Sequence, residues 1–373
     1  MFYIFIWFLL IVMGFLFHDS KRITYCQMLF SILLMGLNSN TADYHIYNDL
    51  YYEIMNNHIS IFNSNWLFKL FFDIVGKFTS VQCVIFCIAL VGIILIYKSV
   101  QFYTKSTALV FSLYLIAPFV IDATQLKNFL AMSVWLYFSR YLFLIYEDKG
   151  HWKENIGKYL IGVVLSGSIH LAFFSTIIFA AIPFISNRRL IFTTIGLNII
   201  VLLISASNII ELIMNKVSLL DSGLANAIVF KYKAYNLKYD SEQVKLRILL
   251  LLLGLVFFLL MYCFALIRSK HMVSVNNRHL KQLAFVLKIN NLMMLMIPLL
   301  FFSVEFYRMQ RNILVINYAV IVNFISESKL LQYKIKPYSF VLEILCFVSA
   351  FFYLYIDAIH WNSTTVFLPL FQV

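Results

Sequence analysis

The stretch GKYLIGVVLSGSIHLAFFSTIIFAAIPFIS, residues 157–186, decides how this chain is arranged. It is longer than the roughly 20 apolar residues that one membrane-spanning helix needs, and too short for two complete spans. Ser166, Gly167, Ser168 and His170 interrupt its middle. We therefore predict a hairpin of two short helices, with its tip within or near one membrane face. Irregular backbone is tolerated there only where protein or water satisfies its polar groups.

The charges on both sides of this stretch support the hairpin. Short basic loops separate the other apolar stretches, at 18–22, 98–105, 147–158, 187–189, 268–281 and 327–336. If 157–186 returns to the side on which it began, all of these loops lie on one face. A single crossing would move 187–189 and 268–281 to the other face. The positive-inside rule assigns the basic face to the cytoplasm, which leaves the loops 39–80 and 211–246 outside.

The composition excludes a soluble protein. Of the 373 residues, 62% are hydrophobic and 12% are charged, which is far more apolar than a soluble domain. We predict an all-α polytopic integral membrane protein, with one transmembrane domain over 1–373 and about ten full spans besides the hairpin. The net charge of +12 is explained by cytoplasmic retention of basic loops, so no nucleic-acid partner is predicted. The spans are expected at 2–17, 23–38, 81–97, 107–121, 128–146, 190–210, 247–267, 283–303, 310–326 and 340–356.

The stretch 61–78, IFNSNWLFKLFFDIVGKF, has a different pattern from the spans. Polar residues recur there every four positions, at Asn65, Lys69, Asp73 and Lys77, and the other positions are mostly apolar. This spacing predicts an amphipathic helix lying in the outer interface. Asp73 and Lys77 are expected to pair along it.

Familiar cofactor motifs are absent from the sequence. The five cysteines all lie in apolar stretches, so we predict no disulfide framework. There is no phosphate-binding P-loop, dinucleotide-binding fingerprint, zinc-ligand spacing or serine-hydrolase motif. We therefore expect no cofactor and no metal site.

Four polar clusters occur near outer span ends, where charge close to hydrocarbon is unfavourable. In the first, Asp43, Tyr47 and Tyr51 share one face of a helix, with Tyr44 beside them. Tyrosine rings suit sugar faces and Asp43 can accept hydrogen bonds from sugar hydroxyls, although an aromatic belt at the interface gives the same pattern.

The second cluster is DATQLKNFLA, residues 122–131. Lys127 and Asn128 open a span there, with Asp122 and Gln125 just before them. A cation at a helix N-terminus favours a phosphate, and we expect Asn128 to contact sugar. The alternative is a lysine that snorkels to the interface.

The third and fourth clusters contribute a histidine and two arginines. His170 lies in the apolar hairpin and is suited to act as a general base, or else is a satisfied structural residue. In SVEFYRMQRN, residues 303–312, Glu305, Arg308 and Arg311 are spaced three apart along one helix face. Two neighbouring arginines favour a multiply charged anion such as a diphosphate, and the alternative is a Glu–Arg pair that anchors the span end.

These residues, in this order, resemble the EpsG family of Wzy-like bacterial polysaccharide polymerases. That family has a DY..Y segment after the second span, an RQ..A motif opening a middle span, a later histidine and a late outer arginine. The matching residues here are Asp43, Tyr44 and Tyr47, then Lys127, Asn128 and Ala131, then His170, and then Arg308 or Arg311. Two positions depart from the motif, because Lys127 replaces the arginine and Asn128 the glutamine.

The resemblance implies a metal- and nucleotide-independent glycosyltransferase in the bacterial plasma membrane. It would join polyprenyl-diphosphate-linked oligosaccharide units into O-antigen, capsule or exopolysaccharide on the outer face. Its partners would be these donor and acceptor lipids, membrane lipids, a flippase and a chain-length regulator. His170 and Asp43 would be catalytic, and Arg308, Arg311 and Lys127 would bind the diphosphate. A flippase for the same lipids, a membrane acyltransferase and a glycan ligase are the alternatives.

Overall fold

The computed structural model describes residues 2–56, 58, 64–205, 215–216, 241–270, 277–295, 307–331, 336–360 and 363–372. Over these ranges the chain forms helices and turns, and they contain no strand. The all-α prediction is therefore confirmed for the described part of the chain. Most of the predicted outer loop 211–246 lies outside it, as does Glu305.

Each predicted span overlaps at least one helix within the described residues. The first half contains α1 (Phe2–Leu16), α2 (Lys21–Leu37), α3 (Tyr44–Met55), α4 (Trp66–Gly76), α5 (Val81–Tyr103), α6 (Thr107–Ile116), α7 (Phe119–Asp122), α8 (Leu126–Glu147) and α9 (Trp152–Ile169). The second half contains η1 (Leu171–Ala181), α10 (Asn187–Ser205), α13 (Ser241–Lys270), α14 (Asn277–Met293), α16 (Tyr307–Asn312), α17 (Leu314–Leu331), α18 (Lys336–Leu354), η3 (Tyr355–His360), η4 (Ser363–Phe367) and α19 (Leu368–Leu370).

Two predicted spans are interrupted in the structure. The stretch 107–121 divides into α6 and α7 next to Pro118, which has no N–H for a continuing helix. The stretch 310–326 divides into α16 and α17 at Ile313.

Three stretches of the described residues are long and apolar enough to cross a membrane: Val81–Tyr103, Leu126–Glu147 and Tyr338–Ile359. Shorter apolar helices cover Phe2–Leu16, Thr107–Ile116, Leu171–Ala181 and Leu252–Ile267. A membrane protein built of helices is therefore supported. The number of about ten full spans stays a prediction.

The predicted hairpin is present as α9 followed by η1. Its two limbs pack against each other and both contact α8. The hydroxyl of Tyr159 in α9 donates to the carbonyl of Thr176 in η1 at 2.6 Å and accepts from the Trp135 indole of α8 at 3.2 Å. The second limb is a 3-10 helix rather than the expected α-helix. His170 separates the limbs in an extended conformation, and its Nδ1 accepts the Ala172 N–H at 3.3 Å.

The basic loops meet at one end of the helix bundle, which we call the basic end. His18, after α1, lies 3.0 Å from Glu343 in α18, and Arg278 of α14 lies 3.2 Å from Glu147 at the end of α8. Lys288 of α14 donates to the Ile185 carbonyl, after η1, at 2.5 Å. These contacts support a shared face for the described parts of the loops that they join, and the shared face of all six loops stays a prediction. Its assignment to the cytoplasm stays a prediction.

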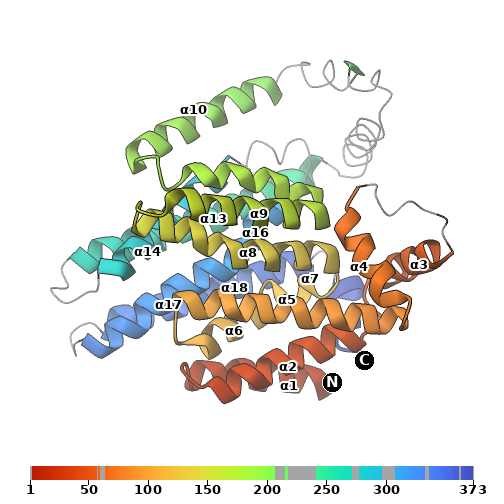
Figure 1. The fold of residues 1–373 in the computed structure, drawn as a ribbon. Helices are drawn as coiled ribbons and strands as arrows, with labels where there is room; N and C mark the ends of the chain where they lie inside the picture. The colour runs from red at the N-terminus through yellow and green to blue at the C-terminus, as the bar shows by residue number, and fades with distance from the viewer. Residues whose placement is uncertain are drawn as a thin grey trace.

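The opposite end, called the site end, carries α3, α4, α7 and both chain termini, at the right of Figure 1. The Asn38 amide after α2 donates to the Leu370 carbonyl at 2.6 Å, which ties the two ends of the chain together. Helix α4 confirms the amphipathic prediction over part of 61–78. Its Phe68, Phe72 and Gly76 are buried at a spacing of four, and Asp73 pairs with Lys77 at 2.8 Å.

Small residues let the central helices approach closely, as is common where helices pack in membranes. A Cβ added at Gly92 of α5 would lie 2.3 Å from the ring of Phe129 in α8. At Gly14 of α1 it would lie 2.0 Å from the Ser112 hydroxyl of α6. The contact at Gly92 holds the first turns of α8 against α5, next to Lys127 and Asn128.

We predict that cysteines placed at the two ends react from opposite sides of the membrane. Phe78 is 85% exposed beyond α4, and Gly150 is exposed in the loop after α8. A membrane-impermeant maleimide should label Phe78→Cys in intact cells, but Gly150→Cys only after permeabilisation. The unsubstituted chain, with its own five cysteines, gives the background. The reverse labelling pattern would place the basic end outside the cell.

Candidate functional site

The start of α8 and the end of α16 are joined by two neighbouring polar contacts. The Arg311 guanidinium donates through Nη2 to Gln125 Oε1 at 2.7 Å. Next to it, the side-chain amides of Asn128 and Asn312 bond to each other at 3.0 and 3.4 Å. Residues far apart in the chain thus cross-link the second and fourth predicted clusters.

Arg311 is fully enclosed by protein. Its exposed fraction is 0%, and its guanidinium donates to the Tyr307 hydroxyl at 3.4 Å and lies 5.6 Å from that ring. Arg308, one turn earlier on α16, is only half-buried. The two arginines share α16 as predicted, but they are not equally accessible, because Arg311 is drawn towards the turn before α8.

The hydroxyl of Tyr47 brings the first cluster to the same place. It accepts the backbone N–H of Lys127 at 3.4 Å, and its ring packs 6.0 Å from Phe68 of α4. Burial raises the pKa of Tyr47, nearby Asp43 raises it further, and the Lys127 N–H and Arg308 act in the opposite direction. The charges of Asp43 and Arg308 and the backbone of Lys127 therefore all act on one buried phenol.

Tyr51 and Tyr44, the other two tyrosines of the first cluster, are both half-buried on α3. Tyr51 donates its hydroxyl to the carbonyls of Thr79, at 2.8 Å, and Gly76, at 3.3 Å. Tyr44 is half-buried and packs against the core, directly after Asp43 at the helix N-cap. The contacts of Tyr51 hold α3 against the end of α4, and packing fixes the orientation of both tyrosine rings.

His170 is connected to the Tyr47 region through contacts made by α4. The N–H of Leu171, its neighbour, donates to the side chain of Asn65 at 3.2 Å. Asn65 begins α4 in a left-handed conformation, with φ 60°, and Phe68 packs on Tyr47 three residues later. The structure thus places His170 at the site end, on the side of α4 where that helix begins.

Comparison with known proteins shows the family to which the chain belongs. The model of the EpsG family matches residues 21–369, which is nearly the whole sequence. This chain belongs to the EpsG family. The family is of the Wzy-like polysaccharide polymerase type. No curated protein and no solved structure matches the chain.

Two site residues of this EpsG-family chain escaped the sequence reasoning. Asn312 and Tyr307 flank the arginines on α16, and each has a defined partner there. Their helical spacing from Arg308 and Arg311 could have indicated that they lie on the same helix face. The partner of Asn312 lies more than a hundred residues away, and the partner of Tyr307 is Arg311 on the same helix. Gln125 and Asp122 stand beside Lys127 in the sequence, but the sequence alone assigns no role to either residue.

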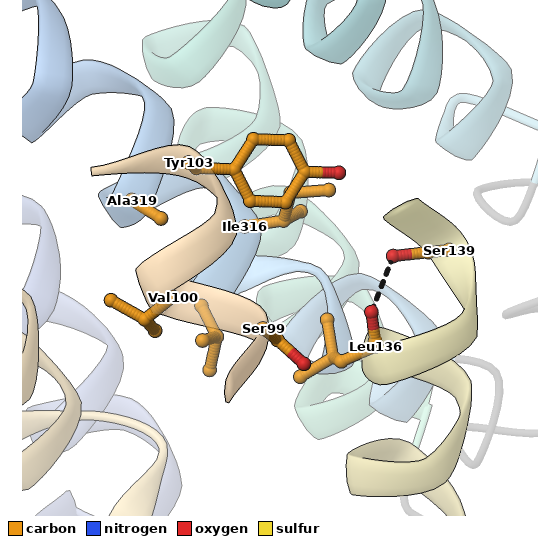
Figure 2. Close-up of a pocket in the computed structure, with 8 residues that line it drawn as sticks. Ser99, Val100, Tyr103, Leu136, Ser139, Ile316 and Ala319 are labelled. Atoms are coloured by element: carbon orange, nitrogen blue, oxygen red, sulfur yellow. Dashed lines mark hydrogen bonds between the residues drawn. The ribbon is translucent and has the colours of Figure 1, made fainter. Parts of the chain in front are cut away.

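The space drawn in Figure 2 is separate from this site. Side chains of α5, α8 and α17 close on one another there and leave no room for a water-sized sphere. Ser139 uses its hydroxyl within its own helix, donating to the Leu136 carbonyl at 2.7 Å. Ser139 lies about 16 Å along α8 from Asn128 by helix rise, so we regard the space as a packing gap.

The described residues of this EpsG-family chain contain no group of three or more histidine, cysteine or acidic side chains placed to hold a metal ion. The residues that converge at the site end are cations, amides, phenols and carboxylates. Such a set is suited to binding phosphate groups and sugar hydroxyls.

We predict that the Asn128–Asn312 pair stabilises the contact between α8 and α16. Alanine at either position should lower the thermal stability of the purified protein in detergent. A double-mutant cycle should give a coupling of about 0.6–1.7 kcal/mol, the range measured between membrane helices. Asn198 bonds within its own helix to the Thr194 carbonyl at 2.9 Å, so Asn198→Ala combined with Asn128→Ala should be additive. Additivity of the 128/312 pair would contradict the contact.

Proposed function

We propose that this protein is a membrane glycosyltransferase. It would polymerise polyprenyl-diphosphate-linked oligosaccharide repeat units into a surface polysaccharide, on the outer face of the bacterial plasma membrane. One observation carries the proposal. Asp43, Arg308 and the backbone of Lys127 lie near Tyr47, and Arg311 bonds to Gln125 at the start of the same helix α8 that Lys127 opens.

The three cations would bind the diphosphate of the donor lipid, which requires the enclosed Arg311 to become accessible when the lipid binds. When the bond from the sugar C1 to the phosphate oxygen breaks, negative charge grows on the departing polyprenyl diphosphate. Positive charge already held in place stabilises that change without rearrangement. Arg311 is held by Gln125 and Tyr307, and Arg308 is half-buried. The leaving group is good enough that neither a nucleotide nor a metal ion is required by this scheme.

The acceptor sugar would enter beside α3 and α4. Its hydroxyl oxygen forms the new bond to C1, and His170 takes the proton that this hydroxyl loses. Asp43 would orient the acceptor by accepting hydrogen bonds from it. Tyr44 and Tyr51 are half-buried and would offer ring faces to the sugar. The ring of Tyr47 is buried against Phe68, so the sugar contact expected of Tyr47 is not available to its ring here, and Tyr47 would instead position the start of α8 through its hydroxyl.

Asn128 would contact the sugar, and it would also hold the neighbouring groups of the site in position. Its amide is paired with Asn312, which fixes the first turn of α8 beneath Lys127. The lipid tails of donor and acceptor would lie between helices in the bilayer. A flippase and a chain-length regulator are the protein partners that this reaction calls for.

The test is a reconstituted assay with the purified protein in liposomes. Lipid-linked repeat units, supplied on the leaflet that faces the site end, should be converted into a ladder of longer lipid-linked glycans. A flippase would move the units between leaflets without lengthening them, an acyltransferase would need an acyl donor, and a ligase would move glycan to a different lipid. Repeat units that stay single in this assay would reject the polymerase.

A further inference from the structure

The carboxyl group of Asp122 is buried with little compensation. Asp122 ends α7, has an exposed fraction of 0%, and lies outside the predicted spans, in the turn before α8. Its Oδ2 accepts the Tyr114 hydroxyl at 3.4 Å, and its Oδ1 has no hydrogen-bond partner. A buried carboxylate with so few donors is costly to keep ionised unless a positive charge lies nearby.

The nearest positive charge that the contacts place there is the guanidinium of Arg311, which bonds to Gln125 in the same turn as Asp122, where the Gln125 N–H donates to the Ile121 carbonyl at 3.0 Å. Burial raises the pKa of Asp122 to about 7, Arg311 and Tyr114 lower it, and Asp357 of η3 raises it. These groups face Asp122 from α16, α6 and η3, and Lys127 opens α8 just beyond it. Near neutral pH the carboxyl group is thus close to the point at which it gains or loses its proton.

We propose that Asp122 and the substrate diphosphate compete for the charge of Arg311, so that Asp122 takes up a proton when a diphosphate binds. This inference rests on the proposed function, since it assumes a diphosphate at Arg311. The bound anion would use the positive charge that keeps Asp122 ionised. A proton from solvent would then join one carboxylate oxygen, and no other bond changes.

Coupling between diphosphate binding and the protonation of Asp122 predicts how the binding affinity changes with pH. The raised pKa means that Asp122 is neutral below about pH 7 and ionised above it. If the neutral form is the one that accepts the diphosphate, affinity falls with the neutral fraction as pH rises. The fall approaches about tenfold for each pH unit above the pKa, because the neutral fraction falls tenfold.

Binding of farnesyl diphosphate to the full-length protein in detergent, measured from pH 6 to pH 8.5, tests the inference. The wild-type chain should lose affinity as pH rises, relative to Asp122→Asn, which is neutral throughout. The ligand titrates identically in both experiments, so the difference isolates Asp122. Asp357→Asn is the matched control, since it removes the neighbouring buried carboxyl group and should keep a pH-dependent loss of affinity.

A second measurement needs no substitution. Calorimetric titrations of the wild-type protein in two buffers of different ionisation enthalpy should show net proton uptake by the protein beyond that of the ligand. Equal pH dependence in wild type and Asp122→Asn, or no proton uptake by the protein, would overturn the inference and leave the diphosphate site intact. Absence of any farnesyl diphosphate binding would remove the proposed diphosphate site itself.

Discussion

Replacing Arg311 with alanine should nearly abolish polymerisation, and replacing Arg308 should lower it strongly. Each arginine would make charge-assisted hydrogen bonds to the diphosphate, worth about 1.5–3 kcal/mol apiece. A contact that strengthens as the leaving group departs lowers the rate about tenfold for every 1.4 kcal/mol lost. Arg311 should show the larger effect, because its removal also leaves Gln125 without its guanidinium partner.

The lysine variants separate charge from geometry. Arg311→Lys and Arg308→Lys should restore only part of the activity, since an ammonium group cannot hold two oxygens in the manner of a guanidinium. Glycan ladders from membranes with matched protein levels provide the measurement. Lys288 is a suitable control, because it is a buried cation (6% exposed) near the basic end. Its substitution should matter much less, and normal ladders from both arginine-to-alanine variants would place the diphosphate site elsewhere.

Replacing His170 with asparagine should also stop the formation of long chains, by about 10²- to 10⁴-fold if the imidazole is the general base. Asparagine is the informative substitution. The Nδ1 of His170 accepts the Ala172 N–H at the start of η1, and asparagine is among the best residues for that capping role. The variant should therefore keep the hairpin while losing the base.

His170→Ala completes the comparison, since it removes both the cap and the base. Chain length on a glycan gel and protein amount on the same membranes are measured together. If His170 only caps η1, asparagine should restore the long chains that alanine loses. That result would remove His170 from the chemistry.

The general architecture was predictable because the bilayer constrains it so strongly. The apolar stretches 81–97 and 128–146 had to form helices to satisfy their backbone in a bilayer, and they are α5 and α8. The positive charge of the basic loops predicted that these loops lie at one end of the bundle. The interrupting residues at Ser166–His170 revealed the hairpin. The 3-10 form of η1 and the break at Ile313 were not visible, because they depend on contacts with neighbouring helices.

The site was predictable as a set of polar residues but not as an arrangement. Charge near hydrocarbon singled out Lys127, Arg308 and Arg311. Nothing local in the sequence says that Arg311 bonds to Gln125, or that the charge of Arg308 acts on Tyr47. Those preferences follow from how α16 crosses the start of α8, a contact between segments with almost no sequence proximity.

The long reach of these contacts has a consequence for how the protein is made. Tyr47 meets Lys127 across 80 residues, and Gln125 meets Arg311 across 186. During synthesis, the turn before α8 enters the membrane long before α16 has been translated. The nascent chain therefore carries Asp122 and Gln125 without their late partner Arg311 until the last fifth of the protein is made. A ribosome-bound or truncated chain that ends before residue 307 lacks both arginines of the proposed diphosphate site, so on the proposed function it would not consume lipid-linked sugars.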